Sequence, residues 1–194
     1  MRKIFIASNN QGKIREIKAI LGDFYDEFYT PRDMDHPFEV VEDGDTFEAN
    51  AVKKAVAGRM SFGMDALADD SGLCVDALDG APGVYSARYS EEGTDEANNK
   101  KLLEALERVP VDQRQARFVS AVALAQKGGR LIVVRGESPG VILTEPRGAG
   151  GFGYDPLFYD ETYRQTYGEM DEETKNAISH RSRALLALRE ELMK

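Results

Sequence analysis

The sequence predicts an α/β protein with a mixed sheet, because strand-like and helix-like segments follow one another throughout the chain without a strict β-α-β alternation. Residues 3–7 form an apolar stretch typical of a short buried strand. A polar loop follows, and isoleucines then recur at helical spacing over residues 13–21. Further along, residues 118–125 and 131–135 are two apolar stretches joined through a Gly-Gly pair, which predicts a hairpin of core strands.

The segment after the first helix has no clear period, so residues 22–44 predict an irregular connection with room for one strand. A second helix is expected from Asp45 to about residue 59, because Asp45 can cap its N-terminus and Glu48 follows at capping-box spacing. The expected buried face consists of Val52, Ala55 and Val56, with Asn50, Lys53 and Lys54 on other faces.

The other expected elements follow from the same signals. A third helix begins at Thr94 and stops before Pro110, and a last helix spans residues 179–192, with leucines facing inward. Short strands are expected at residues 66–68, 73–75, 141–143 and 157–159, with a turn at residues 80–83.

Length and composition indicate one globular domain over residues 1–194. The chain is 42% hydrophobic and 30% charged, which is far from the disordered and fibrous extremes. A length of 194 residues can bury one sizeable core or form two lobes, but is short for two independent domains.

Charge and cysteine content exclude several classes of partner and compartment. The formal charge of −9 argues against direct nucleic-acid binding and against an anionic membrane as partner, because both favour a basic face. The single cysteine, Cys74, cannot form an intrachain disulfide, so we expect a reducing compartment and a cytoplasmic protein. The first apolar stretch is too short for a signal peptide, and none reaches the roughly 18 residues of a membrane span.

A candidate phosphate site lies between the first strand and the first helix, where exposed N–H groups and the helix dipole favour an anion. The segment differs from a Walker A loop, because the leading glycine is missing and Ile14 replaces the metal-binding hydroxyl residue. A polar loop that only caps the helix is the alternative. The segment consists of Ser8, Asn9, Asn10, Gln11, Gly12 and Lys13.

Two adjacent carboxylates, Asp69 and Asp70, follow an apolar strand and indicate a metal site. Unpaired carboxylates are costly to bury, and hard oxygen ligands suit Mg²⁺, which commonly uses one or two of them plus substrate phosphates. Neighbours in extended backbone point to opposite faces, so one of the pair is expected to enter the site, and Asp70 is our choice. A turn in which the aspartates bond their own backbone is the alternative. A second acidic segment, residues 42–45, contributes only if it faces Asp70.

The glycine-rich residues 148–155 contain a formal GxGxxG pattern, but Pro156 and the extended residues after it deny the helix that a dinucleotide site requires. An exposed Phe152 could instead stack on a base, the alternative being a core phenylalanine in a tight loop. Lys175 and the pair His180-Arg181 place cations near the start of the last helix, where the dipole disfavours them unless an anion binds.

These segments together closely resemble the inosine triphosphate pyrophosphatase family, also called Ham1-like or non-canonical purine nucleoside triphosphate pyrophosphatases. The resemblance covers essentially the whole chain. Its most specific stretches are residues 8–13, 68–73, 80–89, 151–156 and 179–181.

The resemblance implies a homodimer in which each subunit has a long mixed β-sheet flanked by helices and two lobes with the nucleotide cleft between them. It implies a Mg²⁺-dependent cleavage of dITP, ITP, XTP or dXTP to the monophosphate and diphosphate, which keeps these bases out of DNA and RNA. It places the catalytic carboxylate at Asp70 and the metal ligands at Glu42 and Asp70. The substrate contacts it implies are residues 8–13, Ser71, Phe152, Gly153, Tyr154, Asp155, Lys175, His180 and Arg181.

The resulting hypothesis is that Mg²⁺ bridges the triphosphate while a carboxylate orients or deprotonates the attacking water, with Lys13 and Lys175 offsetting phosphate charge. Donors such as His180 or Arg181 would favour a 6-oxo purine over adenine. Two alternatives are a pyrophosphatase for modified pyrimidine nucleotides, as in Maf-like proteins, and a nucleotide sensor without catalysis.

Overall fold

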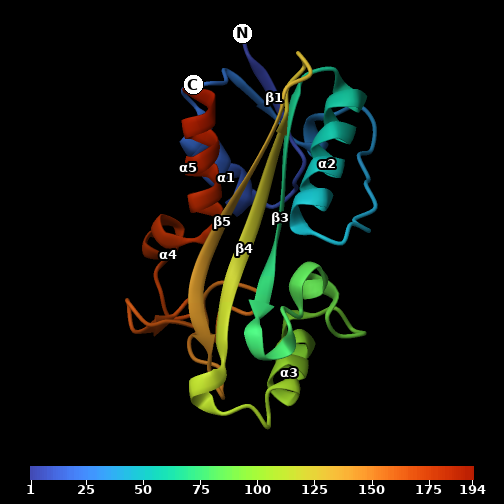
Figure 1. The fold of residues 1–194 in the computed structure, drawn as a ribbon. Helices are drawn as coiled ribbons and strands as arrows, with labels where there is room; N and C mark the ends of the chain where they lie inside the picture. The colour runs from blue at the N-terminus through green and yellow to red at the C-terminus, as the bar shows by residue number, and fades with distance from the viewer. The chain divides into compact units, whose positions relative to one another are not determined.

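The computed structural model describes residues 1–194 and contains one mixed seven-stranded sheet with the strand order β2-β1-β3-β4-β5-β6-β7 (Figure 1). Strand β1 pairs in parallel with β2 and β3, whereas β6 pairs antiparallel with β5 and β7. The predicted α/β class with a mixed sheet is therefore confirmed. The strands are β1 (Lys3–Ile6), β2 (Glu27–Tyr29), β3 (Asp65–Val75), β4 (Gln115–Ala125), β5 (Leu131–Ile142), β6 (Phe158–Asp160) and β7 (Gln165–Thr166).

Five α-helices accompany the strands, and the chain divides into two compact units. Unit 1 comprises Met1–Asp70, Ser120–Gly136 and Arg181–Lys194, and unit 2 comprises Ser71–Val119 and Glu137–His180. The helices are α1 (Gln11–Leu21), α2 (Phe47–Phe62), α3 (Asp95–Ala105), α4 (Glu172–Ile178) and α5 (His180–Leu192).

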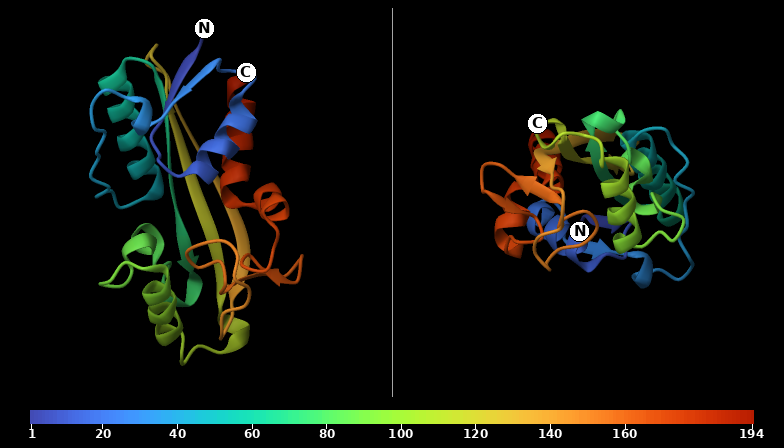
Figure 2. Two further views of the ribbon diagram at one scale, coloured as in Figure 1. Left: turned by 180° about the vertical axis from the view of Figure 1, so that it is seen from behind. Right: turned by 90° about the horizontal axis from the view of Figure 1, so that it is seen from below.

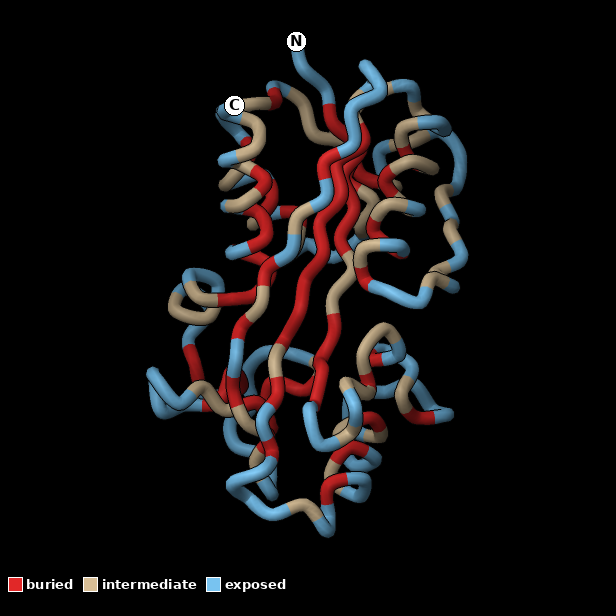
Figure 3. The backbone as a smooth tube through the Cα atoms, viewed as in Figure 1, coloured by how far each residue is buried: buried red, intermediate tan, exposed pale blue.

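In unit 1, helices cover both faces of the strands. Helices α1 and α5 lie side by side over one face, as the front and rear views show (Figures 1 and 2), and their apolar residues bury Ile4, Leu67 and Val122 of the strands. Helix α2 covers the other face so closely that a Cβ at Gly58 would stand 2.8 Å from the ring of Phe5. Figure 3 shows the buried residues gathered along the strands and on the strand-facing sides of these helices.

In unit 2, aromatic side chains form much of the core. The ring of Phe118 lies 4.4 Å from that of Phe158 and 5.6 Å from that of Tyr167, measured between centroids. Leu102 and Leu106, from α3 and the residue that caps its C-terminus, are fully buried in the same cluster. This apolar cluster thus packs the carboxyl-terminal end of α3 against the carboxyl-terminal part of β3 within unit 2.

Helix α2 differs from its prediction at its start and on its buried face. Thr46, not Asp45, caps it, because the hydroxyl of Thr46 accepts a hydrogen bond from the N–H of Ala49 at 3.0 Å. The helix runs to Phe62 and ends at Gly63, which has the left-handed φ of +65°. Asn50 is buried and Val52 and Val56 are only partly so, which corrects the expected faces.

Strand β3 also corrects the sequence analysis, because the expected strands at 66–68 and 73–75 are one strand of 11 residues that includes Asp69 and Asp70. Strand β5 likewise absorbs the strand expected at 141–143. The first helix begins at Gln11, two residues earlier than expected, because Asn10 caps it. Strand β7 and helix α4 were not predicted. No helix of the structure is long and apolar enough to cross a membrane.

Candidate active site

The amino-terminal turn of α1 places Lys13 against the carboxylate of Asp69 in unit 1. The Nζ atom of Lys13 lies 2.7 Å from Asp69, which is 4% exposed. The turn itself is fixed by Asn10, whose side chain accepts a hydrogen bond from the N–H of Lys13 at 3.1 Å. Ser8 in turn accepts from the N–H of Asn10. Part of the predicted phosphate segment is therefore helical, and its lysine already neutralises a buried carboxylate.

Arg181, in the first turn of α5, is a second cation beside Asp69. Its Nε lies 3.4 Å from the Asp69 carboxylate, and its Nη1 lies 3.4 Å from the carboxylate of Glu16 on α1. Burial would raise the pKa of Asp69, but the nearby charges of Lys13 and Arg181 hold it well below the usual value. Asp69 is consequently an ionised, fully paired residue that ties α1, β3 and α5 together.

Asp70 has a different environment from its neighbour. Its carboxylate accepts a hydrogen bond of 2.9 Å from the side-chain amide of Asn50, on α2. Burial raises the pKa of Asp70, and the charges of Glu42 and Asp69 act in the same direction. The alternation expected of extended backbone thus separates the pair: Asp69 meets cations, and Asp70 meets an amide and further negative charge. The alternative of a turn in which the aspartates bond their own backbone is excluded, since both lie within β3.

Lys54 connects the acidic loop to the strand that carries both aspartates. Its Nζ donates to the carboxylate of Glu42 at 2.9 Å and to the backbone carbonyl of Asp69 at 2.7 Å. Asn50, one helical turn earlier, also accepts from the N–H of Gly44 at 2.8 Å. The loop containing Glu42 is therefore held against α2 and β3 by two side chains of one helix.

Glu42 and Asp70 form an oxygen donor set that fits a hard divalent cation. Lys54 binds both the Glu42 carboxylate and the backbone carbonyl of Asp69, so Glu42 is held beside β3 at the residue that precedes Asp70. No group of three or more His, Cys, Asp or Glu side chains is arranged to hold a metal by itself. Mg²⁺ needs no such group, because it commonly takes one or two carboxylates and completes its shell with water and substrate phosphates. The residues present fit that mode.

Three residues of this group were missed by sequence analysis: Glu16, Asn50 and Lys54. Asn50 and Lys54 are four residues apart in α2, so they share a helix face. A pattern of an amide and a lysine at this spacing, directly after an acidic loop, was the available signal. Because Val52 and Val56 are apolar, we predicted that their side of α2 faces inward, and not the side that carries Asn50.

A second set of predicted residues lies in unit 2, around the glycine-rich loop. Phe152 is 57% exposed, which excludes the alternative of a core phenylalanine. The ammonium group of Lys175, on α4, lies 4.6 Å from the centre of the Phe152 ring and forms an ion pair with the buried carboxylate of Asp155. Asp155 also accepts a hydrogen bond of 2.9 Å from the N–H of Phe152. Strand β6, and not a helix, comes directly after the loop, as Pro156 and the extended residues after it predicted.

Glycine is required within this loop. Gly151 has a φ of +73°, and a Cβ there would stand 2.1 Å from the Asp155 carboxylate. Gly153 also has a positive φ, +59°, but with open space around it. The loop thus closes tightly over Asp155 and presents Phe152 outward.

The other predicted contacts in unit 2 are more buried than expected. Tyr154 is 4% exposed and donates its hydroxyl hydrogen to the carbonyl of Ser86 at 2.7 Å, so its side chain belongs to the core. His180 is 8% exposed, and its ring stacks on Phe118 at 5.0 Å between centroids. Ser71 is half-buried in β3.

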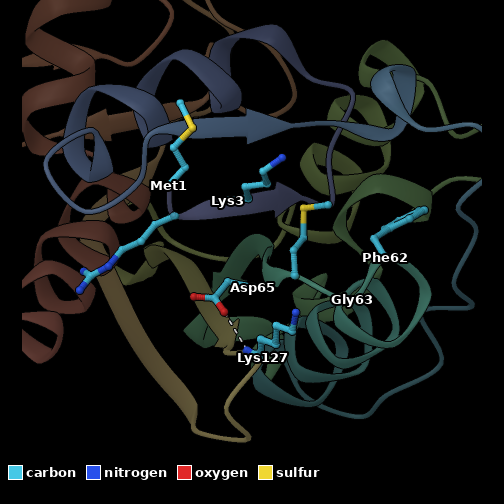
Figure 4. A pocket seen from close by; sticks show the side chains of 8 residues that line it. Met1, Lys3, Phe62, Gly63, Asp65 and Lys127 are labelled. Carbon is cyan, nitrogen blue, oxygen red and sulfur yellow. Dashed lines mark hydrogen bonds between the residues drawn. The ribbon is translucent and has the colours of Figure 1, made fainter.

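A pocket of about 370 Å³ lies elsewhere in unit 1, near the amino-terminal ends of β1 and β3 (Figure 4). Lys3, Phe62, Asp65 and Lys127 are among its lining residues, and the Asp65 carboxylate accepts a hydrogen bond from the backbone N–H of Lys127. Neither Asp70 nor Lys13 lines it. We place the candidate active site at the carboxylates, because paired buried charges and a metal-type donor set occur there.

Known proteins share both the sequence and the fold of this chain. The Ham1 family model matches residues 4–191. A dITP/XTP pyrophosphatase of Geobacter sulfurreducens is 52% identical over 99% of this chain and 97% of its own length, and one of Desulforamulus reducens is 52% identical over 94% and 92%. The solved structure of a HAM1 protein from Coxiella burnetii has a TM-score of 0.92 and 40% identity, and covers 100% of this chain and 99% of that one.

Proposed function

Because the chain belongs to the Ham1 family, we propose that it hydrolyses non-canonical purine nucleoside triphosphates, namely ITP, dITP, XTP and dXTP, to the monophosphate and diphosphate. The activity is that of a nucleoside triphosphate diphosphatase, and its role is to remove these nucleotides before they enter DNA or RNA. The relatives named as dITP/XTP pyrophosphatases support this substrate class, since they align with nearly the whole chain.

The observation that carries the proposal is the contrast between Asp69 and Asp70. Asp69 is neutralised by Lys13 and Arg181, so it serves as a structural anchor. Asp70 accepts a hydrogen bond from the neutral amide of Asn50, and burial raises its pKa, so its carboxylate can accept a proton. Glu42, held beside β3 by Lys54, adds a second set of carboxylate oxygens for a cation. We assign the catalytic role to Asp70 for this reason.

In the proposed mechanism, Glu42 and Asp70 would hold Mg²⁺, which when bound would supply charge neutralisation for the phosphates. The Asp70 carboxylate also orients or deprotonates the water that attacks the α-phosphorus. Lys54 keeps the Glu42 carboxylate beside β3 and adds positive charge next to the acidic pair. Residues 8–13, at the start of α1, contact the phosphates through the N–H groups of the helix terminus and the nearby Lys13.

For the base, we propose stacking on Phe152, whose exposed ring is available to a purine. Lys175 acts on this loop through Asp155 and the Phe152 ring, in addition to the proposed offset of phosphate charge. Arg181 is the counter-charge of Asp69, and His180 or Arg181 is the proposed donor to the 6-oxo group. Ser71 and the backbone of residues 153–155 complete the proposed contacts.

We further propose a cytoplasmic homodimer that needs neither nucleic acid nor a membrane as partner. The single buried cysteine supports a reducing compartment, and the net charge of −9 supports the absence of an anionic polymer partner.

The decisive experiment compares diphosphate release with Mg²⁺ from inosine, xanthosine, guanosine, adenosine and thymidine triphosphates. Strong release from only the first two supports the proposal, and its loss on chelation supports the metal. Equal release from all five would keep the chemistry but remove the selective role. Release from the pyrimidine alone would favour a Maf-like activity, and binding without release would indicate a sensor.

A further inference from the structure

The loop that presents Phe152 is held by contacts on its Gly153 peptide as well as by Lys175. Helix α3 supplies these contacts from two residues one turn apart, Asp95 and Asn99. The carboxylate of Asp95 accepts a hydrogen bond of 2.7 Å from the N–H of Gly153. The side-chain amide of Asn99 donates one of 2.9 Å to the carbonyl of the same glycine. Both polar groups of Gly153 are therefore bound by α3.

The position of Asp95 suits this contact. It is the first residue of α3 after the cap Thr94, where the helix dipole stabilises a negative charge. Hydrogen bonds to an ionised acceptor are stronger than those between neutral groups. The contact to Gly153 thus does not depend on a neighbouring cation.

The hydrogen bond to Gly153 is the polar contact made by the Asn99 side chain, whose other polar atom has no partner. Its Oδ1 atom is buried and has no hydrogen-bond partner. A buried acceptor without a partner costs free energy that an apolar side chain at the same place would avoid. The hydrogen bond that Nδ2 donates to the carbonyl of Gly153 offsets this cost.

Lys175 and Asp155 hold the other end of the loop. The ion pair between them and the hydrogen bond from the Phe152 N–H to Asp155 fix the backbone at residues 152 and 155. With Gly153 bound to α3, the Phe152 ring projects from a short segment anchored on both sides. An aromatic ring that is already oriented loses less conformational freedom when a base stacks on it.

We propose that Asp95 and Asn99 are positioning residues that hold Phe152 in its stacking orientation and so determine the affinity for the purine base. The inference rests on the proposed function for the identity of the base. It requires that both residues act through the Phe152 loop and not on the reacting phosphates.

The first test uses tryptophan as a probe, because the chain contains none. In F152W, the anisotropy and acrylamide quenching of the single tryptophan report the order and exposure of the loop without any nucleotide. Adding N99A or D95A should lower the anisotropy and increase quenching. D95N keeps an acceptor for the Gly153 N–H and should restore most of the signal. E96A is the matched control, since Glu96 is the exposed next residue of the same helix.

The second test measures kinetics with ITP. N99A and D95A should raise KM about tenfold, equivalent to about 1.4 kcal/mol, with kcat within about twofold of wild type, because stacking contributes to ground-state and transition-state binding alike. In an F152A background, N99A should raise KM no further, since residues that act as one unit are not additive. Unchanged anisotropy in F152W/N99A, or additive effects in F152A/N99A, would overturn the proposal.

The two proposals fail in different ways. If the wild type releases no diphosphate from ITP, the proposed function is wrong, yet the tryptophan signal still tests the role of Asp95 and Asn99. If the wild type is active but neither the anisotropy nor KM responds to N99A, only the positioning role is wrong. Thermal unfolding of every variant, with N99D as a second substitution, separates loss of positioning from loss of the fold.

Discussion

Asn50 donates a hydrogen bond to Asp70 and accepts one from the backbone of Gly44, so a single amide links β3 to the loop that carries Glu42. The amide makes both contacts at once, because its NH₂ group donates to the carboxylate while its carbonyl oxygen accepts from the N–H. The two proposed metal ligands are therefore positioned by the same residue, which itself is 1% exposed.

Replacing Asn50 by aspartate separates its two contacts. N50D retains an acceptor for Gly44 but places a carboxylate against Asp70, so we expect diphosphate release to fall by about 10- to 100-fold while the protein stays folded. N50L removes both contacts and should also destabilise the fold by about 1–3 kcal/mol, the cost of leaving buried polar groups unpaired. Urea unfolding and a diphosphate assay distinguish the two, and wild-type turnover in N50D would contradict the assignment.

Asp70→Asn should nearly abolish turnover and leave the fold intact. The amide keeps the size of the side chain but cannot accept a proton and is a weaker ligand for Mg²⁺, so a loss on the order of 10²- to 10⁴-fold in kcat is expected. Initial rates with ITP at saturating Mg²⁺, together with the unfolding temperature, check this. An active D70N with normal kcat would remove Asp70 from the mechanism.

Asp69→Asn should instead act on stability. It leaves the partly buried Lys13 without its carboxylate and the buried Arg181 with Glu16 alone, a loss of about 3 kcal/mol in the free energy of unfolding near neutral pH. Equilibrium urea unfolding measures it. D23N, which loses only a surface ion pair with Arg189, should change by less than about 1 kcal/mol.

The pH dependence of the D69N effect has a definite sign. The folded-state pKa of Asp69 lies below its ordinary value of 3.8. Its ionised form therefore contributes stability that is fully present above 3.8 and is lost as the pH falls through the lower, folded-state value. The difference between wild type and D69N should shrink only in that acidic range. A difference that already disappears near neutral pH would show that Asp69 is not the stabilised anion.

Thr46→Ala tests the capping of α2. Removing the hydroxyl that accepts from the Ala49 N–H should cost about 1 kcal/mol, measured by chemical denaturation. D45A is the matched control, because Asp45 was the expected cap but the structure places it outside the helix. It should change stability by less than about 0.5 kcal/mol, a value typical of surface positions. The reverse order of effects would restore the cap expected from the sequence.

The sequence predicted most elements because their signals are local. Thr94 before α3 and the helical spacing of Ile14 and Ile17 in α1 indicated helices without tertiary information. The pair Asp69-Asp70 was misleading for the same reason. We expected two adjacent acids to follow the end of a strand, but Lys13 and Arg181, which are distant in sequence, neutralise Asp69 inside β3, and Asn50 donates to Asp70.

The candidate site was predicted in part. The exposure of Phe152 is as the sequence suggested, whereas the roles of residues 8–13, Glu42 and Asp70 stay predictions. Asn50 and Lys54 were missed although their spacing was an available signal, because Val52 and Val56 suggested a different inward face for α2. Asp95 and Asn99 are invisible to motif analysis, since their partner is a backbone peptide 58 and 54 residues away.

The two glycines of the Phe152 loop should behave differently under random mutation and selection. At position 151 any Cβ would collide with the carboxylate of Asp155 in addition to adopting a disfavoured φ, so glycine alone should survive. At position 153 only the φ of +59° opposes a side chain, and asparagine, which tolerates the left-handed region, should persist among functional clones. Position 151 should thus accept glycine only, whereas position 153, two residues later, should accept glycine or asparagine.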